Sequence, residues 1–175
     1  MILTRLEILK ELKSGRVEIQ PFTESALTSN SYSFHLAPVL IEFPESDLAG
    51  AGDGIRREIG REGYLLRPGR LYLGLTVETT GSDLYSQILH GNRSIGSLGI
   101  WVHVTAPLGH VGSRIRWTLE ICVVREVLVF PGMEFGKIAF LANEGEIIGY
   151  ASPRFHESGK YSRNDISECE KYPEF

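Results

Sequence analysis

Cysteine is scarce in this chain, which has only Cys122 and Cys169 among its 175 residues. The two lie far apart and share no spacing that is typical of metal ligands, so the sequence argues against a disulfide framework and a zinc site. Free thiols suit a reducing compartment, and we therefore expect a cytoplasmic protein.

The sequence also lacks an excess of basic residues and any long apolar run. Its net charge of −4 argues against a surface that binds a nucleic-acid polymer, although it leaves room for one local basic pocket. No stretch approaches the length of a membrane span, and the N-terminus has no signal-peptide pattern. We expect a soluble protein that binds neither a nucleic-acid polymer nor a membrane.

Common catalytic motifs are absent as well. The chain contains no Walker loop, no nucleophile elbow, and no zinc-deaminase signature of the His-x-Glu and Pro-Cys-x-x-Cys type. Any catalysis must therefore depend on side chains outside these motifs.

One helix is predicted, at the N-terminus of what we take as a single domain over residues 1–175. Thr4 and Glu7 have the spacing of a capping box, and Gly15 is a natural C-terminal stop. The apolar stripe of this helix is expected to consist of Leu6, Leu9 and Leu12.

Short strands between turn signals fill most of the remaining chain and predict a mainly β protein, a barrel or a sandwich. The strands are expected at 17–22, 31–38, 64–69, 71–80, 97–106, 113–124 and 137–142. Between them we expect a glycine-rich loop at 49–54 and a solvated, charged excursion at 56–62. Residues 150–175 form a polar tail that could close over a site.

The strand predicted at 113–124 carries the best catalytic candidate, Glu120. A period of two places the apolar side chains of 115, 117, 119, 121 and 123 on one face and those of the even-numbered residues on the other. Glu120 is then a carboxylate in the middle of a strand. It is either a solvated glutamate, close to Arg116 on the same face, or a general base in a partly apolar cleft.

Two neighbouring segments favour the catalytic interpretation. The segment 91–94, Gly-Asn-Arg-Ser, combines a flexible turn with a cation and a hydroxyl, and is either a phosphate cradle or an ordinary exposed turn. His103 is either a ligand or base, or a structural histidine in a strand.

Several segments, taken in order, resemble the blocks of the dCTP deaminase/dUTPase family, and most closely its dCTP deaminase branch. These segments are 18–22, 29–32, 66–78, 91–99, 102–106, 130–133 and 160–161. Glu120 lies fourteen residues after Ala106, the spacing at which that family carries its catalytic glutamate. The resemblance extends over nearly the whole chain.

The resemblance implies a distorted β-barrel or jelly-roll-like core of the dUTPase type with a short N-terminal helix. It also implies a homotrimer with active sites shared between subunits, and Mg²⁺ held mainly by the triphosphate of a nucleotide substrate rather than by protein ligands. The deamination it implies needs no zinc.

By the same resemblance, Glu120 activates the water that adds to C4 of cytosine, and Ser94 assists at the reacting base. The residues expected to contact the substrate are Asn92, Arg93, Ala106, His110, Thr118, Lys160 and Asn164. Arg93 and Lys160 would serve the phosphates, and backbone groups of Ala106 the pyrimidine or the water.

This chain departs from the family's pattern at two places. The first is residues 91–99, where the family has Gly-Arg-Ser-Ser-Leu-Ala-Arg-Leu-Gly. In this chain Asn92 replaces the first arginine, Arg93 replaces the first serine, and Ser97 replaces the second arginine. Where the family has an Ile-Asp-Pro-Gly turn, His110 stands at the aspartate.

Three functions therefore stay open. The first is hydrolytic deamination of a cytosine nucleotide, by default dCTP to dUTP and ammonia, which Glu120 favours. The second is a dUTPase-like pyrophosphatase, against which the missing aspartate counts. The third is a relative retuned to an unusual nucleotide or reduced to nucleotide binding, which Ser97 and His110 favour.

Overall fold

The computed structural model describes residues 1–43 and 54–147. These residues leave out the predicted loop at 49–54 except for Gly54, and the tail from 150, which includes Lys160 and Asn164. The elements in chain order are α1 (Arg5–Lys13), β1 (Glu18–Gln20), the 3-10 helix η1 (Glu24–Ala26), β2 (Tyr32–Phe43), β3 (Ile55–Glu58), β4 (Tyr64–Leu66), β5 (Leu71–Gly81), β6 (Tyr85–Gly91), α2 (Arg93–Leu98), β7 (Ile100–Trp101), β8 (Leu108–Gly109), β9 (Arg114–Val123), β10 (Val127–Val129) and β11 (Glu134–Ala142).

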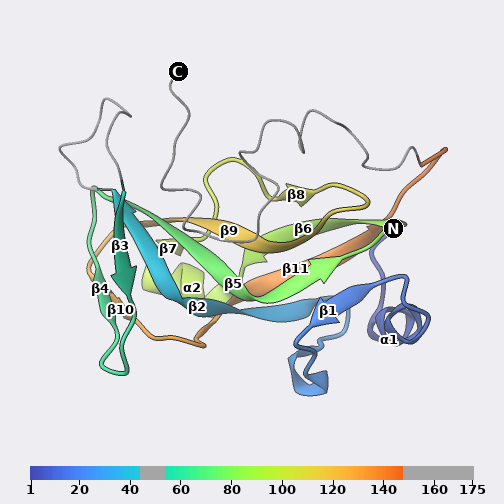
Figure 1. The fold of residues 1–175 in the computed structure, drawn as a ribbon, viewed down its shortest axis with the longest axis horizontal. Helices are drawn as coiled ribbons and strands as arrows, with labels where there is room; N and C mark the ends of the chain where they lie inside the picture. The colour runs from blue at the N-terminus through green and yellow to red at the C-terminus, as the bar shows by residue number, and fades with distance from the viewer. Residues whose placement is uncertain (44–53, 148–175) are drawn as a thin grey trace.

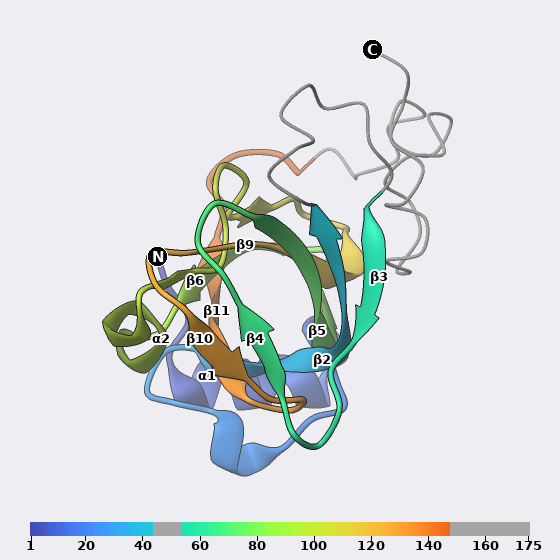
Figure 2. The ribbon, with the colours of Figure 1, turned by 90° about the vertical axis from the view of Figure 1, so that its left-hand side faces the viewer.

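The fold is mainly β, as predicted. Nine strands form one sheet in the order β7-β9-β5-β2-β11-β6-β8, with β1 paired to β5 and β3 to β2, and β10 and β4 form a separate pair. Seen end-on, the large sheet curls into a half-barrel (Figure 2). Helix α1 lies near β1 at one end of the sheet, and the β4–β10 pair lies at the other (Figure 1).

The N-terminal helix is confirmed. Its predicted apolar stripe is confirmed for Leu9 and Leu12, which pack against the main core, and is wrong for Leu6. Thr4 precedes α1 without a side-chain capping bond, and Gly15 follows it with a φ of +73°, which favours glycine. Leu6 is exposed, whereas Ile8 and Glu11 are buried. A carboxylate can occupy the buried face because Arg16 donates to Glu11, over 2.7 Å from Nη2 to Oε1.

The strand predicted at 97–106 is also wrong, because most of the segment has another structure. Residues 93–98 form helix α2, and the strand that follows, β7, covers only Ile100 and Trp101. The Asn92 side chain accepts a hydrogen bond from the Ile95 N–H at the start of α2, and Gly99 ends it with a φ of +81°. The turn predicted at 91–94 is therefore the beginning of a helix.

Two further segments differ from the prediction. The charged excursion at 56–62 begins as strand β3, which pairs with β2 through four residues from Ile55↔Glu42 to Glu58↔Val39. Strand β6 was missed because its sequence, with Gln87 among apolar residues, does not alternate clearly. Tertiary pairing with β11 and β8 determines both of its edges.

The main core contains residues from both helices and both sheets. Its largest fully buried side chains include Tyr32, Phe34, Tyr72, Phe135 and Phe140. A smaller cluster of Ala37, Ile41, Leu73 and Leu75 packs separately on β2 and β5. Within residues 1–43 and 54–147, no helix combines the length and apolar character that crossing a membrane requires.

Candidate active site around strand β9

Strand β9 has the two faces that its sequence predicts. Trp117, Leu119, Ile121 and Val123 are buried, whereas Thr118 is exposed and Glu120 is partly exposed. The polar face of β9 therefore presents the Glu120 carboxylate. Pairing with β5 on one side and with β7 on the other holds its backbone in place.

Two backbone N–H groups bind the Glu120 carboxylate. The N–H of Val104 donates to Oε2 over 2.7 Å, and the N–H of Thr105 donates to the same oxygen over 2.9 Å. The other oxygen, Oε1, has a longer contact of 3.5 Å from the Thr105 hydroxyl. One oxygen is thus anchored by two short hydrogen bonds and the other has a single long contact, an arrangement suited to a fixed general base.

The Cys122 thiol is a second titratable group near Glu120 on the same face. Cys122 follows two residues later, and burial and then the neighbouring Glu120 carboxylate raise the pKa of its thiol. The thiol therefore stays protonated near neutral pH and adds no charge. Arg116, also on this face, donates from Nε to the Thr76 carbonyl over 2.8 Å.

Helix α2 is anchored at both ends. At its start Asn92 Nδ2 donates to Glu134 Oε1 over 2.9 Å, in addition to the capping bond. At its end the Arg125 guanidinium donates to the carbonyls of Ser97 and Leu98 over 3.0 and 3.1 Å. Both polar atoms of Asn92 thus have partners within the chain, and the helix is a fixed platform for the side chains that it exposes.

The anchoring partner of Asn92 is a carboxylate in a polar cluster. Burial alone would raise the pKa of the Glu134 carboxyl, but hydrogen bonds from Lys137 and Asn92 together lower it below its ordinary value. Glu134 is therefore ionised at neutral pH, and its charge is balanced by Lys137 over 2.8 Å.

Arg93 and Ser94 are exposed on the first turn of α2. No other side chain among the described residues pairs with the Arg93 guanidinium, so it is available to a ligand. The Ser97 hydroxyl, one turn later, donates back to the Arg93 carbonyl over 2.9 Å. The i and i+4 positions share a face of a helix, so Arg93 and Ser97 point to the same side of α2.

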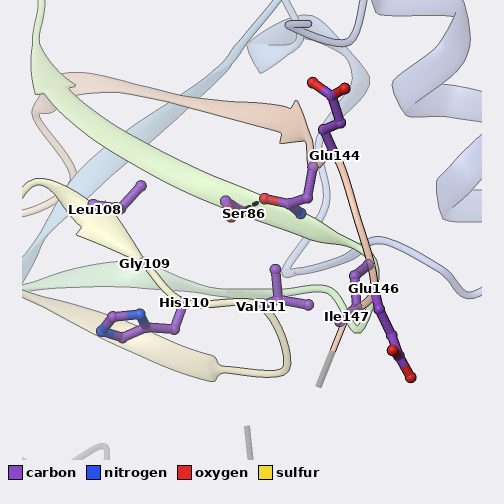
Figure 3. A pocket seen from close by; sticks show the side chains of 9 residues that line it. Ser86, Leu108, Gly109, His110, Val111, Glu144, Glu146 and Ile147 are labelled. Atoms are coloured by element: carbon purple, nitrogen blue, oxygen red, sulfur yellow. Dashed lines mark hydrogen bonds between the residues drawn. The ribbon is translucent and has the colours of Figure 1, made fainter. Parts of the chain in front are cut away.

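His110 lies in a different place, beside a pocket of about 310 Å³. The pocket lies between the β8 turn and the end of β11, and its polar lining includes Ser86, His110, Asn143, Glu144 and Glu146. The two glutamate carboxylates point away from each other (Figure 3). Ser86 Oγ hydrogen-bonds Asn143 Oδ1 over 2.6 Å and so connects β6 to this end of β11.

The predicted site residues form three groups within one chain. Glu120 and Thr118 lie on β9, with Ala106 in the exposed segment next to the anchoring residues Val104 and Thr105. Arg93 and Ser94 lie on α2, and His110 lies at the pocket. His103 directly precedes the anchoring residue Val104, and its buried Nδ1 has no hydrogen-bond partner within the described part of the chain.

The sequence did not reveal which groups hold these residues. The donors to Glu120 are backbone N–H groups, which any residue type supplies, so no sequence signal could have identified them. Arg125 was missed because it lies in a turn beyond β9, and only the fold brings it to the end of α2.

The structure describes no group of three or more histidine, cysteine, aspartate or glutamate residues that converge as metal ligands within 1–43 and 54–147. In this part of the chain the carboxylates at the pocket and on β9 lie in separate places.

Comparisons with known proteins agree with one another. Residues 2–142 match the family described as dCTP deaminase-like. Two similar proteins, each named "dCTP deaminase, dUMP-forming", come from Leptospira biflexa and Cytophaga hutchinsonii. The first is 41% identical over 166 residues, 94% of this chain and 91% of the relative, and the second is 42% identical over 94% and 92%.

A solved structure shares the fold. The crystal structure of 2'-deoxycytidine 5'-triphosphate deaminase from Agrobacterium tumefaciens superposes with a TM-score of 0.65 at 16% identity. The match covers 90% of this chain but only 53% of that one, so this chain spans about half the length of the solved protein.

Proposed function

This chain belongs to the dCTP deaminase-like family, and on that premise we propose that it hydrolytically deaminates a cytosine nucleotide. The observation that carries the proposal is the Glu120 carboxylate, anchored through one oxygen by two backbone N–H groups in the middle of β9. In the proposed reaction Glu120 takes a proton from water as the oxygen adds to C4 of cytosine. It then delivers that proton to the amino group, and ammonia leaves.

We further propose that the product is dUMP rather than the dUTP that the sequence alone suggested as a default. The relatives at about 40% identity are named as dUMP-forming. The balance is then dCTP and two waters giving dUMP, ammonia and pyrophosphate, so one site performs a deamination and a phosphoanhydride hydrolysis.

The test is an incubation with dCTP and Mg²⁺ in which ammonia, pyrophosphate and nucleotide mass are followed together. We expect ammonia and pyrophosphate in equal amounts and the mass of dUMP. Ammonia with accumulating dUTP would contradict the second step only. Pyrophosphate without ammonia would support the pyrophosphatase alternative instead.

A second candidate, a nucleotide binder or a relative retuned to an unusual nucleotide, is favoured by specific residues. Ser97 and His110 stand where the resembling family has an arginine and an aspartate. The same incubation with a panel of nucleotides tests this candidate. If the protein only binds a nucleotide, that nucleotide should raise the melting temperature of the protein while its own mass stays unchanged.

Mg²⁺ is proposed to enter with the substrate. Phosphate oxygens are ligands that Mg²⁺ prefers, and it commonly binds to proteins through few side chains. Removing Mg²⁺ with a chelator should therefore abolish turnover of the triphosphate.

We propose that the active protein is a homotrimer whose sites combine groups from different copies. Glu120, Arg93 and His110 form separate groups in one chain, which is consistent with completion by a neighbour. Trp101 on edge strand β7 is 63% exposed, and Val124, which directly follows β9 and donates its N–H to the Gly99 carbonyl next to β7, is 68% exposed. Together they offer an apolar contact surface.

Trp101→Glu should therefore dissociate the trimer, because a carboxylate cannot be buried without a partner at an apolar contact. Light scattering at micromolar concentration measures the change. The control is Leu6→Glu, which alters a residue of α1 that is 77% exposed. A wild-type protein that is monomeric and fully active would contradict the shared site.

His110→Asp should change the choice between dCTP and CTP. A carboxylate only accepts hydrogen bonds and can hold a sugar hydroxyl in one orientation, whereas an imidazole donates or accepts. We expect the ratio of kcat/KM for dCTP over CTP to rise about tenfold, the effect of about one hydrogen bond. His90→Asp on β6 is the matched control. If this ratio does not change, the difference in nucleotide preference from the rest of the family must come from residues 92–97 instead.

A further inference from the structure

A buried chain of polar side chains, the β9–β8 relay, connects strand β9 to the turn that carries His110. Trp117 Nε1–H donates to Thr80 Oγ1 over 2.9 Å, and the Thr80 hydroxyl donates to Gln87 Oε1. Gln87 Nε2 faces Ser113 Oγ over 3.5 Å, and the Ser113 hydroxyl donates to the His110 carbonyl over 2.7 Å. The relay crosses the interior from β9 through β5 and β6 to the loop before β9.

The hydrogen bonds of the relay run in one direction. An indole N–H can only donate, so the Thr80 hydroxyl that accepts from it passes its own proton on. Gln87 must therefore present its oxygen to Thr80 and its amide N–H to Ser113. Ser113 then keeps its proton for the His110 carbonyl. Thr80 and Gln87 have no solvent exposure, so leaving either without its partner would be costly.

Packing fixes the same turn from its other side. The register pairs Gln87 with Gly109, and a Cβ on Gly109 would lie 2.6 Å from the Trp117 ring. The indole thus occupies space that only a glycine leaves open. The N–H of Gly112 donates to the Ser82 carbonyl over 2.6 Å. Gln87 lies at the centre of these contacts.

The Glu120 carboxylate is held independently of this relay. Its donors are the N–H groups of Val104 and Thr105, which are on the opposite side of β9 from the buried Trp117. A change in the relay should thus move the His110 turn and leave the general base in place.

We propose that Gln87 is a positioning residue that fixes the His110 turn for substrate binding. The inference rests on the proposed function, because it takes this turn and its pocket as one wall of the nucleotide site. Gln87 itself touches no substrate. It acts through Ser113 on the backbone of His110.

The relay is interrupted by Gln87→Leu and by Ser113→Ala. Of the two substitutions, Ser113→Ala disturbs the packing less. Both variants should raise KM for the cytosine nucleotide about tenfold and change kcat less than about twofold, since the lost interaction serves binding and not the reacting atoms. The control is Leu89→Val on the same strand, which lowers the melting temperature but should leave KM unchanged. An unchanged KM in both relay variants, or an equal rise in the control, would overturn the proposal.

Gln87→Glu separates a positioning role from a general loss of stability. A protonated carboxyl has one acceptor and one donor, like the amide, whereas an ionised one only accepts. The KM of this variant divided by that of the wild type should fall toward one as the pH is lowered. A ratio that does not depend on pH would contradict the directional relay.

Amide hydrogen exchange tests the relay even if the wild type deaminates no nucleotide and the proposed function fails. In Gln87→Leu the N–H groups of Gly112 and Ser113 should exchange at least about tenfold faster, because their turn opens more often. Those of Val104 and Thr105 should keep their wild-type rates. Unchanged exchange at Gly112 and Ser113 would overturn the proposal even in an active enzyme.

Discussion

Glu120→Gln should lower kcat for deamination by about 10³-fold, within the range that general acid–base catalysis contributes. The amide oxygen can still accept from the N–H groups of Val104 and Thr105, so the side chain keeps its position. Its amide nitrogen cannot take a proton from water. The loss should therefore fall on the transition state, and nucleotide affinity should change less than about threefold.

Single-turnover kinetics and a separate binding titration measure the two quantities. The matched control is Glu126→Gln, which removes a carboxylate from an exposed pair with Arg67 and should leave both quantities unchanged. If Glu120→Gln keeps more than about a tenth of the wild-type kcat, Glu120 is an ordinary strand glutamate and the proposed mechanism fails.

Arg93→Ala should weaken binding of the triphosphate by about 10- to 100-fold, the effect of losing one or two charge-assisted hydrogen bonds. The guanidinium has no partner among the residues that the structure describes, so the free protein loses nothing when it is removed. The nucleoside, which has no phosphates, should bind almost equally well to both proteins. Raising the salt concentration should weaken wild-type binding more than that of the variant.

Calorimetry with the triphosphate, the monophosphate and the nucleoside measures these differences. Arg61→Ala is the control, because Arg61 is also exposed and unpaired within the described residues, but lies between β3 and β4. An equal loss of affinity for all three ligands would place Arg93 outside the phosphate site. A loss in Arg61→Ala of the same size would show a general effect of net charge.

The sequence alone determined the character of β9 and the position of its carboxylate. Successive side chains of a strand point to opposite faces, so the alternation predicts one apolar face without any knowledge of the neighbours. On that face Trp117, Leu119, Ile121 and Val123 are buried, whereas Ile115 is only partly buried. The same local logic predicted α1, its end at Gly15, and the mainly β fold. The resemblance to the family, which the comparisons confirmed, rested on the order of short segments and needed no coordinates.

The short helix α2 was not predicted from local sequence preferences. Six residues with Gly96 and Ser97 among them have little helix preference, and the segment 97–106 contains β-branched residues that favour a strand. The helix is stabilised by the Asn92 cap, the left-handed Gly99 and the distant Arg125 guanidinium. Only the first two of these were visible in the sequence.

Only the tertiary structure decided what holds the candidate site. Glu120 is anchored by backbone groups fifteen and sixteen residues away, and Thr80 meets Trp117 across thirty-seven. Such contacts depend on the register between strands and on the path of the 102–113 segment from β7 to β8 and back to β9. Every residue type except proline has a backbone N–H, so the sequence does not show which residues donate to a carboxylate through the backbone. It can therefore place the carboxylate but not its donors.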